Sequence, residues 1–300
     1  MTARHSMEVD IERIENHVAR LAGVPRPAES DELARARDYV ALTLDSCGWE
    51  VERVPFEIQD EYGDSLTGIN LVAHHRDRPT SKTGPRLCVG AHVDSRPDSP
   101  GADDNASAVA TMLEIARLLP KSWPDRQRLE LELVGFDLEE NGMLGGEFHA
   151  KRTKAEGSDL RGMISLEMLG YCDHTPGSQS LPRTLVGLYP DTGDFIAVIG
   201  NQNSERLIEQ FRTGMQQVGG LPVETLNVPS NGEYLQASRL SDHSPFWDAG
   251  YPALMITDTS FMRNPHYHTP SDTPETLDRE FLQLVAQGCL EAVRLTLCDG

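Results

Sequence analysis

The chain has 300 residues, with 27 Lys and Arg against 47 Asp and Glu, so its formal net charge is −20. This length permits one large α/β domain or two smaller ones. Nucleic acid and membranes are excluded as predicted partners, because nucleic acid and anionic membrane surfaces need a basic footprint and no apolar run reads as long enough to cross a bilayer.

The predicted elements alternate between strands and helices along the chain. Apolar residues at helical spacing predict a helix over 8–22, and Ser30 opens a second helix that ends near residue 48. The pattern then predicts strands over 49–58, 66–74, 87–92, 129–136, 163–166, 195–199 and 252–257, with helices over 106–119, 143–154, 205–218 and 281–297. We therefore predict one α/β domain over residues 1–300, with a central mixed, largely parallel β-sheet flanked by helices on both faces. Residues 1–29 form an N-terminal helical extension in this prediction, and 171–190 an irregular insertion.

The five cysteines are scattered, odd in number and without a CxxC pair. This pattern is not typical of a disulfide framework or a thiolate metal site. Cys88 lies in an apolar run and is predicted to be a small core residue. The first ten residues contain no apolar segment of a signal peptide, so a reducing cytoplasm is the predicted location.

Candidate ligands follow the predicted strand ends, where sites form in largely parallel sheets. His92 ends the apolar run 87–92, and Asp94 comes two residues later. A lone histidine at a strand end is most often structural. A carboxylate at this spacing can fix the imidazole tautomer, however, as partners of metal-bound histidines do. His92 is thus a candidate metal ligand and Asp94 its orienting partner.

Two adjacent aspartates, Asp103 and Asp104, lie in a Gly-Ala-Asp-Asp-Asn turn before the helix predicted over 106–119. The ordinary role of Asp at this place is to cap the helix, so one of the pair can cap while the other binds metal. A bridging carboxylate needs both oxygens presented from a rigid turn, and the sequence context favours Asp104.

Three glutamates follow two further predicted strands. Glu139 and Glu140 come after the strand at 129–136, and Glu167 directly follows the strand at 163–166. The ordinary alternative for the adjacent pair is a solvated loop. In the functional interpretation one of them binds metal, while the other takes a proton from water and passes it to the leaving amine. Glu167 needs a partner or a metal, because it directly follows buried strand residues.

The last candidate ligand is a histidine, and spacing alone does not choose between His266 and His268. Imidazole and carboxylate ligands without a thiolate suit a pair of zinc ions, with manganese or cobalt as alternatives. Such a pair supports metal-assisted hydrolysis. The alternative is a set of unrelated acids in an acidic protein, and their recurrence at predicted strand ends and tight turns argues against it.

Taken as an ordered set, these motifs resemble the zinc-dependent aminopeptidases of peptidase family M28. The resemblance covers about residues 30–297, and the matching segments are 90–95, 101–107, 136–142, 165–171, 241–246 and 264–273. It implies two zinc ions, one held by His92 and Glu167, the other by Glu140 and His268, with Asp104 bridging both. It also implies that Glu139 is the general base and acid, that Asp94 orients His92, and that Tyr267 matches a tyrosine that steadies the oxyanion in some members.

The implied substrate is a peptide with a free N-terminus, and no oligomeric state is indicated. Many members have Asp at the position of Glu167, whose longer arm still reaches a metal. The usual Ala-Ser-Gly turn is Ala-Ser-Ala at 106–108, which we expect to be harmless.

Three alternatives stay open. A glutaminyl-peptide cyclotransferase shares the fold but uses a single zinc. A carboxypeptidase needs an Arg or Lys to hold the substrate carboxylate, and Arg239 and Arg263 lie near the motifs. An inactive metal-binding or protein-binding module is disfavoured by the presence of both Glu139 and Glu140.

Overall fold

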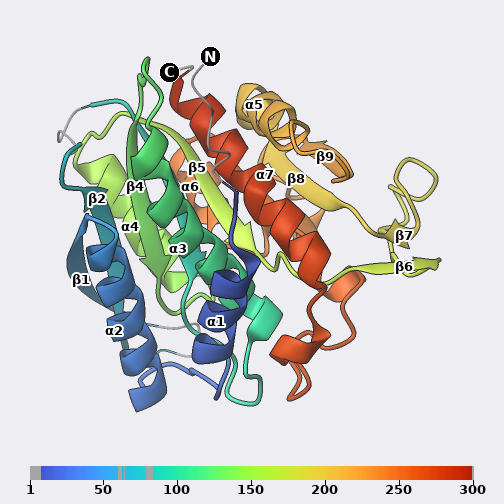
Figure 1. Cartoon of the computed structure of the whole chain (residues 1–300), viewed down its shortest axis with the longest axis horizontal. Helices are drawn as coiled ribbons and strands as arrows, with labels where there is room; N and C mark the ends of the chain where they lie inside the picture. The colour runs from blue at the N-terminus through green and yellow to red at the C-terminus, as the bar shows by residue number, and fades with distance from the viewer. Residues whose placement is uncertain (1–7, 60–62, 64, 79–83, 299–300) are drawn as a thin grey trace.

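The computed structural model describes residues 8–59, 63, 65–78 and 84–298. The predicted N-terminal extension 1–29 therefore begins outside the described residues. An eight-stranded sheet in the order β1-β2-β4-β3-β5-β10-β8-β9 forms the centre of the molecule (Figure 1). Its strands are β1 (Trp49–Gln59), β2 (Ser65–His75), β3 (Arg86–His92), β4 (Glu130–Phe136), β5 (Leu160–Glu167), β8 (Ile196–Asn201), β9 (Val223–Val228) and β10 (Ala253–Thr257).

The four central strands β4, β3, β5 and β10 run parallel to one another. The outer strands make the sheet mixed, because β1, β2 and β4 pair antiparallel and so do β10 and β8. Strand β3 is buried along its whole length, as expected for a central strand covered on both faces. The predicted mixed, largely parallel sheet is therefore confirmed, and the carboxyl ends of its four central strands meet at one edge.

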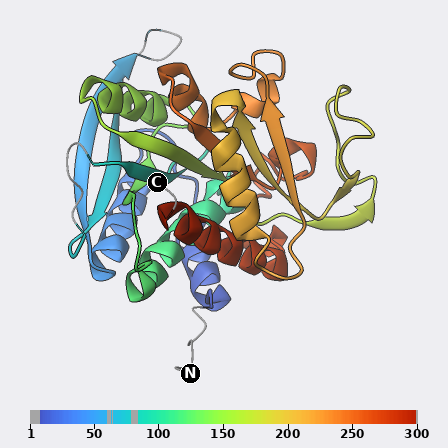
Figure 2. The ribbon, with the colours of Figure 1, turned by 90° about the horizontal axis from the view of Figure 1, so that it is seen from above.

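Helices cover both faces of the sheet (Figures 1 and 2). One face carries α1 (Ile11–Leu21), α2 (Asp31–Ser46), α3 (Ala108–Leu118), α5 (Glu205–Met215) and α7 (Arg279–Cys298), whose apolar residues form the main core. The other face carries α4 (Leu144–Ala155) and α6 (His243–Ala249). Ser30 caps α2 through a hydrogen bond from the Leu33 amide, 3.1 Å long, so the predicted start of that helix is confirmed.

Two elements escape the sequence patterns. Strand β9 lies at the sheet edge with mostly half-buried residues, so it lacks a clear alternation of apolar and polar positions. Helix α6 has seven residues and contains a proline, so it is too short to show a clear helical periodicity. The predicted irregular insertion 171–190 contains one short strand, β6 (Asp173–Pro176), which pairs with β7 (Thr192–Gly193), just beyond its end, in a two-stranded ribbon that extends from the body of the molecule (Figure 2).

Helix α7 is long and apolar enough to cross a membrane by length and composition alone, which the sequence analysis does not anticipate. In the structure 61% of its apolar window is buried inside the protein. Burial of this extent is what a helix in a protein core shows, and α7 packs against α5, α3 and the rest of the main core.

Candidate metal centre and active site

The predicted ligands converge at the edge where the parallel strands end. His92 is the last residue of β3, Glu167 is the last residue of β5, and Glu139 and Glu140 follow β4. Asp104 comes from the turn before α3, where Gly101 has a φ of 66° and a side chain would collide with the Asp104 carbonyl oxygen. Side chains far apart in the sequence are thus brought together by the sheet order.

These residues form two groups of three that share Asp104. In the first group, His92 Nε2 lies 3.2 Å from Asp104 Oδ1 and 3.6 Å from Glu167 Oε1. In the second group, His268 Nε2 lies 3.2 Å from Asp104 Oδ2 and 3.2 Å from Glu140 Oε2. Each group has ligand atoms close enough to hold one ion. One oxygen of Asp104 faces each group, which is the arrangement that a bridging carboxylate requires.

The charges of the site fit divalent cations. His92 Nε2 and Glu140 Oε1 are buried and have no hydrogen-bond partner among the described residues, which is costly unless a ligand or ion satisfies them. Burial and the neighbouring Asp104 raise the pKa of Glu140 to about 7. Burial opposes the charged form of His268, but Asp104 and Glu140 raise its pKa to about 9. The nitrogen and oxygen donors lack a thiolate, so the set suits zinc, manganese or cobalt.

Two buried aspartates hold the backbone of the site. The carboxylate of Asp94 accepts hydrogen bonds from the amides of Glu139 and Glu140, each 3.1 Å long. The carboxylate of Asp272 accepts hydrogen bonds from the amides of Asp103 and Asp104, at 2.9 and 3.2 Å. Each aspartate therefore fixes one turn that presents metal ligands.

Asp94 also faces His92, although its carboxylate is 3.5 Å from His92 Nδ1. The nearer atom is the carbonyl oxygen of Asp94, 3.2 Å from Nδ1. The backbone therefore supplies the contact that selects the imidazole tautomer, and the carboxylate acts mainly on Glu139 and Glu140. Asp94 was predictable from the sequence as a neighbour of His92, but its contacts with the Glu139 and Glu140 amides were not.

Glu139 and Tyr267 lie beside the two groups without belonging to either. Glu139 Oε2 is 3.9 Å from His92 Nε2, and burial together with nearby carboxylates raises the pKa of Glu139. The ring of Tyr267 stacks on His268 with 3.7 Å between centroids. Burial and the site carboxylates raise the pKa of Tyr267, so its hydroxyl keeps its proton and can donate a hydrogen bond.

The two alternative ligands of the sequence analysis have other roles in the structure. Asp103 accepts hydrogen bonds from the Gly170 amide at 2.9 Å and from the Asn264 side chain at 2.8 Å, and it does not cap the helix. His266 contacts the Ser271 hydroxyl through Nδ1 at 2.8 Å. It belongs to neither group of three.

Three supporting residues were missed. The hydroxyl of Ser241 donates to Glu167 Oε2 at 2.7 Å. Asp242 is fully buried next to this serine, and burial together with Glu167 and Asp94 raises its pKa. The buried guanidinium of Arg26 donates to the carbonyls of Val93 and Pro100, at 2.9 and 2.6 Å. The matching segment 241–246 was a signal for the first two, whereas nothing local marks Arg26.

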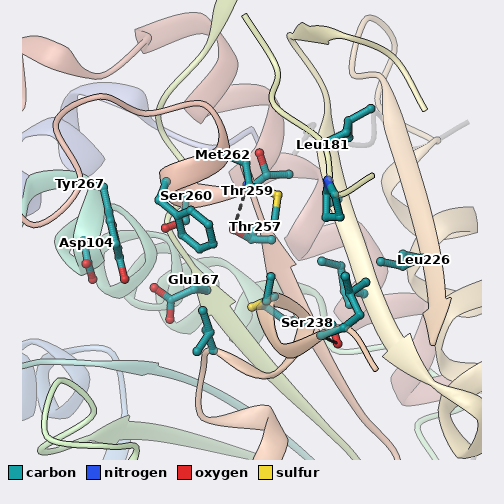
Figure 3. Close-up of a pocket in the computed structure, with 18 of the residues that line it drawn as sticks. Asp104, Glu167, Leu181, Leu226, Ser238, Thr257, Thr259, Ser260, Met262 and Tyr267 are labelled. Atoms are coloured by element: carbon teal, nitrogen blue, oxygen red, sulfur yellow. Dashed lines mark hydrogen bonds between the residues drawn. The ribbon is translucent and has the colours of Figure 1, made fainter. Parts of the chain in front are cut away.

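A pocket of about 260 Å³ extends from the metal ligands along β10, β8 and β9. In Figure 3, Asp104, Glu167 and Tyr267 lie at one side, and Leu181, Leu226 and Met262 line the remainder. Four apolar side chains at β8 and β10 form a small cluster that lines the pocket wall: Phe195 just before β8, Ala197 and Ile199 in β8, and Met255 in β10. The site thus joins a polar centre to an apolar chamber.

A model of peptidase family M28 matches residues 70–293. The chain belongs to peptidase family M28. By family it is therefore a metallopeptidase. The protein YfbL of Escherichia coli is 33% identical over 96% of this chain and 88% of its own length. Aminopeptidase YwaD of Bacillus subtilis is 31% identical, over 69% of this chain but only 41% of its own length.

Solved structures share the fold of this M28 peptidase. The aminopeptidase from Aneurinibacillus sp. strain AM-1 superposes with a TM-score of 0.72 at 19% identity, covering 95% of this chain and 93% of that one. A glutaminyl cyclase of Porphyromonas gingivalis also gives 0.72, at 20% identity, with 96% and 98% covered. At these identities the likeness shows the zinc-peptidase fold, which confirms the predicted fold class, and the choice between the two activities has to come from the site.

Proposed function

We propose that this M28 peptidase is a dinuclear zinc aminopeptidase that releases N-terminal amino acids from peptides. The observation that carries the proposal is the shared Asp104, whose two oxygens face two separate groups of ligands at 3.2 Å each. His92 and Glu167 would complete one zinc site, and Glu140 and His268 the other. Bound there, the two ions would polarise the scissile carbonyl and lower the pKa of a water molecule toward neutrality.

Glu139 is the proposed proton carrier. It takes a proton from the attacking water and later gives it to the departing amine. Because its pKa is raised, Glu139 can hold that proton between the two transfers. Tyr267 lines the same pocket, and its hydroxyl would donate a hydrogen bond to the oxyanion that forms on the substrate carbonyl.

The surroundings of the site support a substrate with a cationic N-terminus and an apolar first residue. Asp104, Glu139, Glu140 and Glu167 all line the pocket, which favours a positively charged amine. The adjoining chamber is walled by Leu226, Met255 and other apolar residues, which favours an apolar side chain. The name of the Bacillus subtilis relative agrees with this activity.

The single-zinc cyclotransferase has the same fold, as the Porphyromonas gingivalis enzyme illustrates. Two complete groups of three ligands favour the dinuclear peptidase, because a single ion leaves one of these groups without its cation.

Leucyl anilide and N-acetyl-leucyl anilide, assayed with the zinc-loaded protein, test the proposal. We expect hydrolysis of the first only, with loss of activity after exhaustive chelation. Glu139→Gln should lower kcat by about 100-fold or more at unchanged zinc content. Glu147→Gln, on the exposed side of α4 where Glu147 pairs with Lys151, is the matched control and should keep full activity. Activity of Glu139→Gln within tenfold of the parent, or hydrolysis that survives chelation, contradicts the proposal.

A further inference from the structure

One arginine side chain lines the pocket, and the proposed reaction gives it no role. From the sequence, Arg239 and Arg263 were candidates to hold a substrate carboxylate. Neither lines the pocket. Arg263 is buried, donates to Gln179 and to the Phe195 carbonyl, and stacks on the Phe195 ring. Arg239 is held by Asp248 and by the Asn231 carbonyl.

Arg96 does line the pocket, two residues beyond Asp94 in the loop that follows β3. Its Nη1 donates to the carbonyl oxygen of Glu140 at 3.2 Å, and its Nε is 3.9 Å from Glu140 Oε2. The side chain remains 46% exposed, so its contacts with Glu140 leave part of it accessible. Among the described residues that line this pocket, it is the one lysine or arginine.

The sheet order places Arg96 and the apolar chamber on opposite sides of the ligand cluster. Glu140 follows β4, whereas the chamber is built on β10, β8 and β9. Strands β3 and β5, which supply His92 and Glu167, lie between them. Figure 3 likewise places Glu167 between Asp104 and Leu226. A peptide whose first side chain enters the chamber therefore directs the residue after the scissile bond toward the Glu140 side.

An arginine at this place suits a carboxylate. The planar guanidinium binds carboxylates through paired hydrogen bonds. The carboxylates that line the pocket would instead repel a negatively charged substrate group. We propose that Arg96 forms a subsite for the α-carboxylate of the residue that follows the scissile bond, so that free dipeptides with an apolar first residue are the preferred substrates. This inference rests on the proposed aminopeptidase function and narrows its substrate class.

The test compares the dipeptide Leu-Ala with its C-terminal amide, using the zinc-loaded enzyme. The measured quantity is the ratio of kcat/KM for the acid to kcat/KM for the amide. In the parent enzyme we expect a ratio of about 10 to 100, the range for hydrogen bonds to a charged group. Arg96→Gln should bring the ratio to about 1, and Arg96→Lys should give an intermediate value, since lysine keeps the charge but not the planar fork. Arg161→Gln, at the opposite end of β5 where Arg161 pairs with Asp159, is the matched control and should keep the parent ratio.

A parent ratio near 1 overturns the subsite. So does an equal fall of both substrates in Arg96→Gln, because Arg96 would then act only by supporting Glu140. Failure of the aminopeptidase function has a different signature: the parent would cleave neither Leu-Ala nor its amide. Cleavage of N-acetyl-Leu-Ala with a preference for the free acid would support the carboxylate subsite and contradict the requirement for a free N-terminus.

Discussion

Asp94 offers the sharpest test of how the site is held together. Its two carboxylate oxygens accept one backbone hydrogen bond each from Glu139 and Glu140, and it is fully buried. Asp94→Asn keeps one acceptor and turns an amide group toward the other N–H. One charge-assisted hydrogen bond, worth about 1.5–3 kcal/mol, is therefore lost. If that energy holds the general base and a metal ligand in place, kcat falls by about 10-fold to 100-fold.

The assay is kcat on leucyl anilide, together with zinc affinity by calorimetric titration. Asp94→Ala removes both acceptors and should lose more activity than Asp94→Asn. Asp98→Asn, an exposed position in the same loop, is the control and should resemble the parent. Full activity and parent-like zinc affinity in Asp94→Asn would refute the conclusion that this carboxylate positions Glu139 and Glu140.

Three further predictions follow from the structure. Ser241→Ala removes the 2.7 Å hydrogen bond to Glu167, and a titration should show about tenfold weaker affinity for one of the two zinc ions. Unchanged affinity for both ions would contradict this. Ala197→Phe fills part of the apolar chamber and should shift the preference from leucyl toward alanyl anilide; an unchanged ratio of kcat/KM values would show that the side chain binds elsewhere. Burial lowers the pKa of His243 from 6.5 to about 4, so the folded protein keeps this ring neutral while the unfolded chain binds a proton below pH 6.5. This contribution to stability is complete above pH 6.5 and is lost as the pH falls toward 4, by about 3 kcal/mol in total. Between pH 7 and 4, denaturant unfolding should therefore show a larger loss of stability in the parent than in His243→Gln. Equal losses would contradict the conclusion that His243 is neutral in the folded protein.

Much of the fold is predictable because its signals are local. The buried strand β3 is a continuous apolar run, and α2 has a serine cap followed by helical periodicity. Strand β9 and helix α6 were missed for physical reasons: an edge strand does not need a buried face, and a seven-residue helix shows barely two turns. Their positions are determined by packing against β8 and β10, which the sequence pattern does not contain.

In the candidate site, too, residues with local sequence signals were predictable and residues placed by long-range contacts were not. His92, Glu140 and Glu167 could be predicted because strand ends in a parallel sheet meet at one edge. The backbone contacts of Asp94 and Asp272 could not, since they link turns that are 45 and 169 residues apart in the chain. Arg96 was missed for a similar reason, because only the folded loop shows that its side chain reaches the pocket.

The central claim is that Asp104 bridges two zinc ions, and metal stoichiometry tests it most directly. Metal-free protein, titrated with zinc and checked by elemental analysis, should bind two ions per chain. His268→Ala removes one ligand from the group formed with Asp104 and Glu140, and it should retain one tightly bound ion. A parent enzyme that is fully active with a single zinc per chain would contradict the claim.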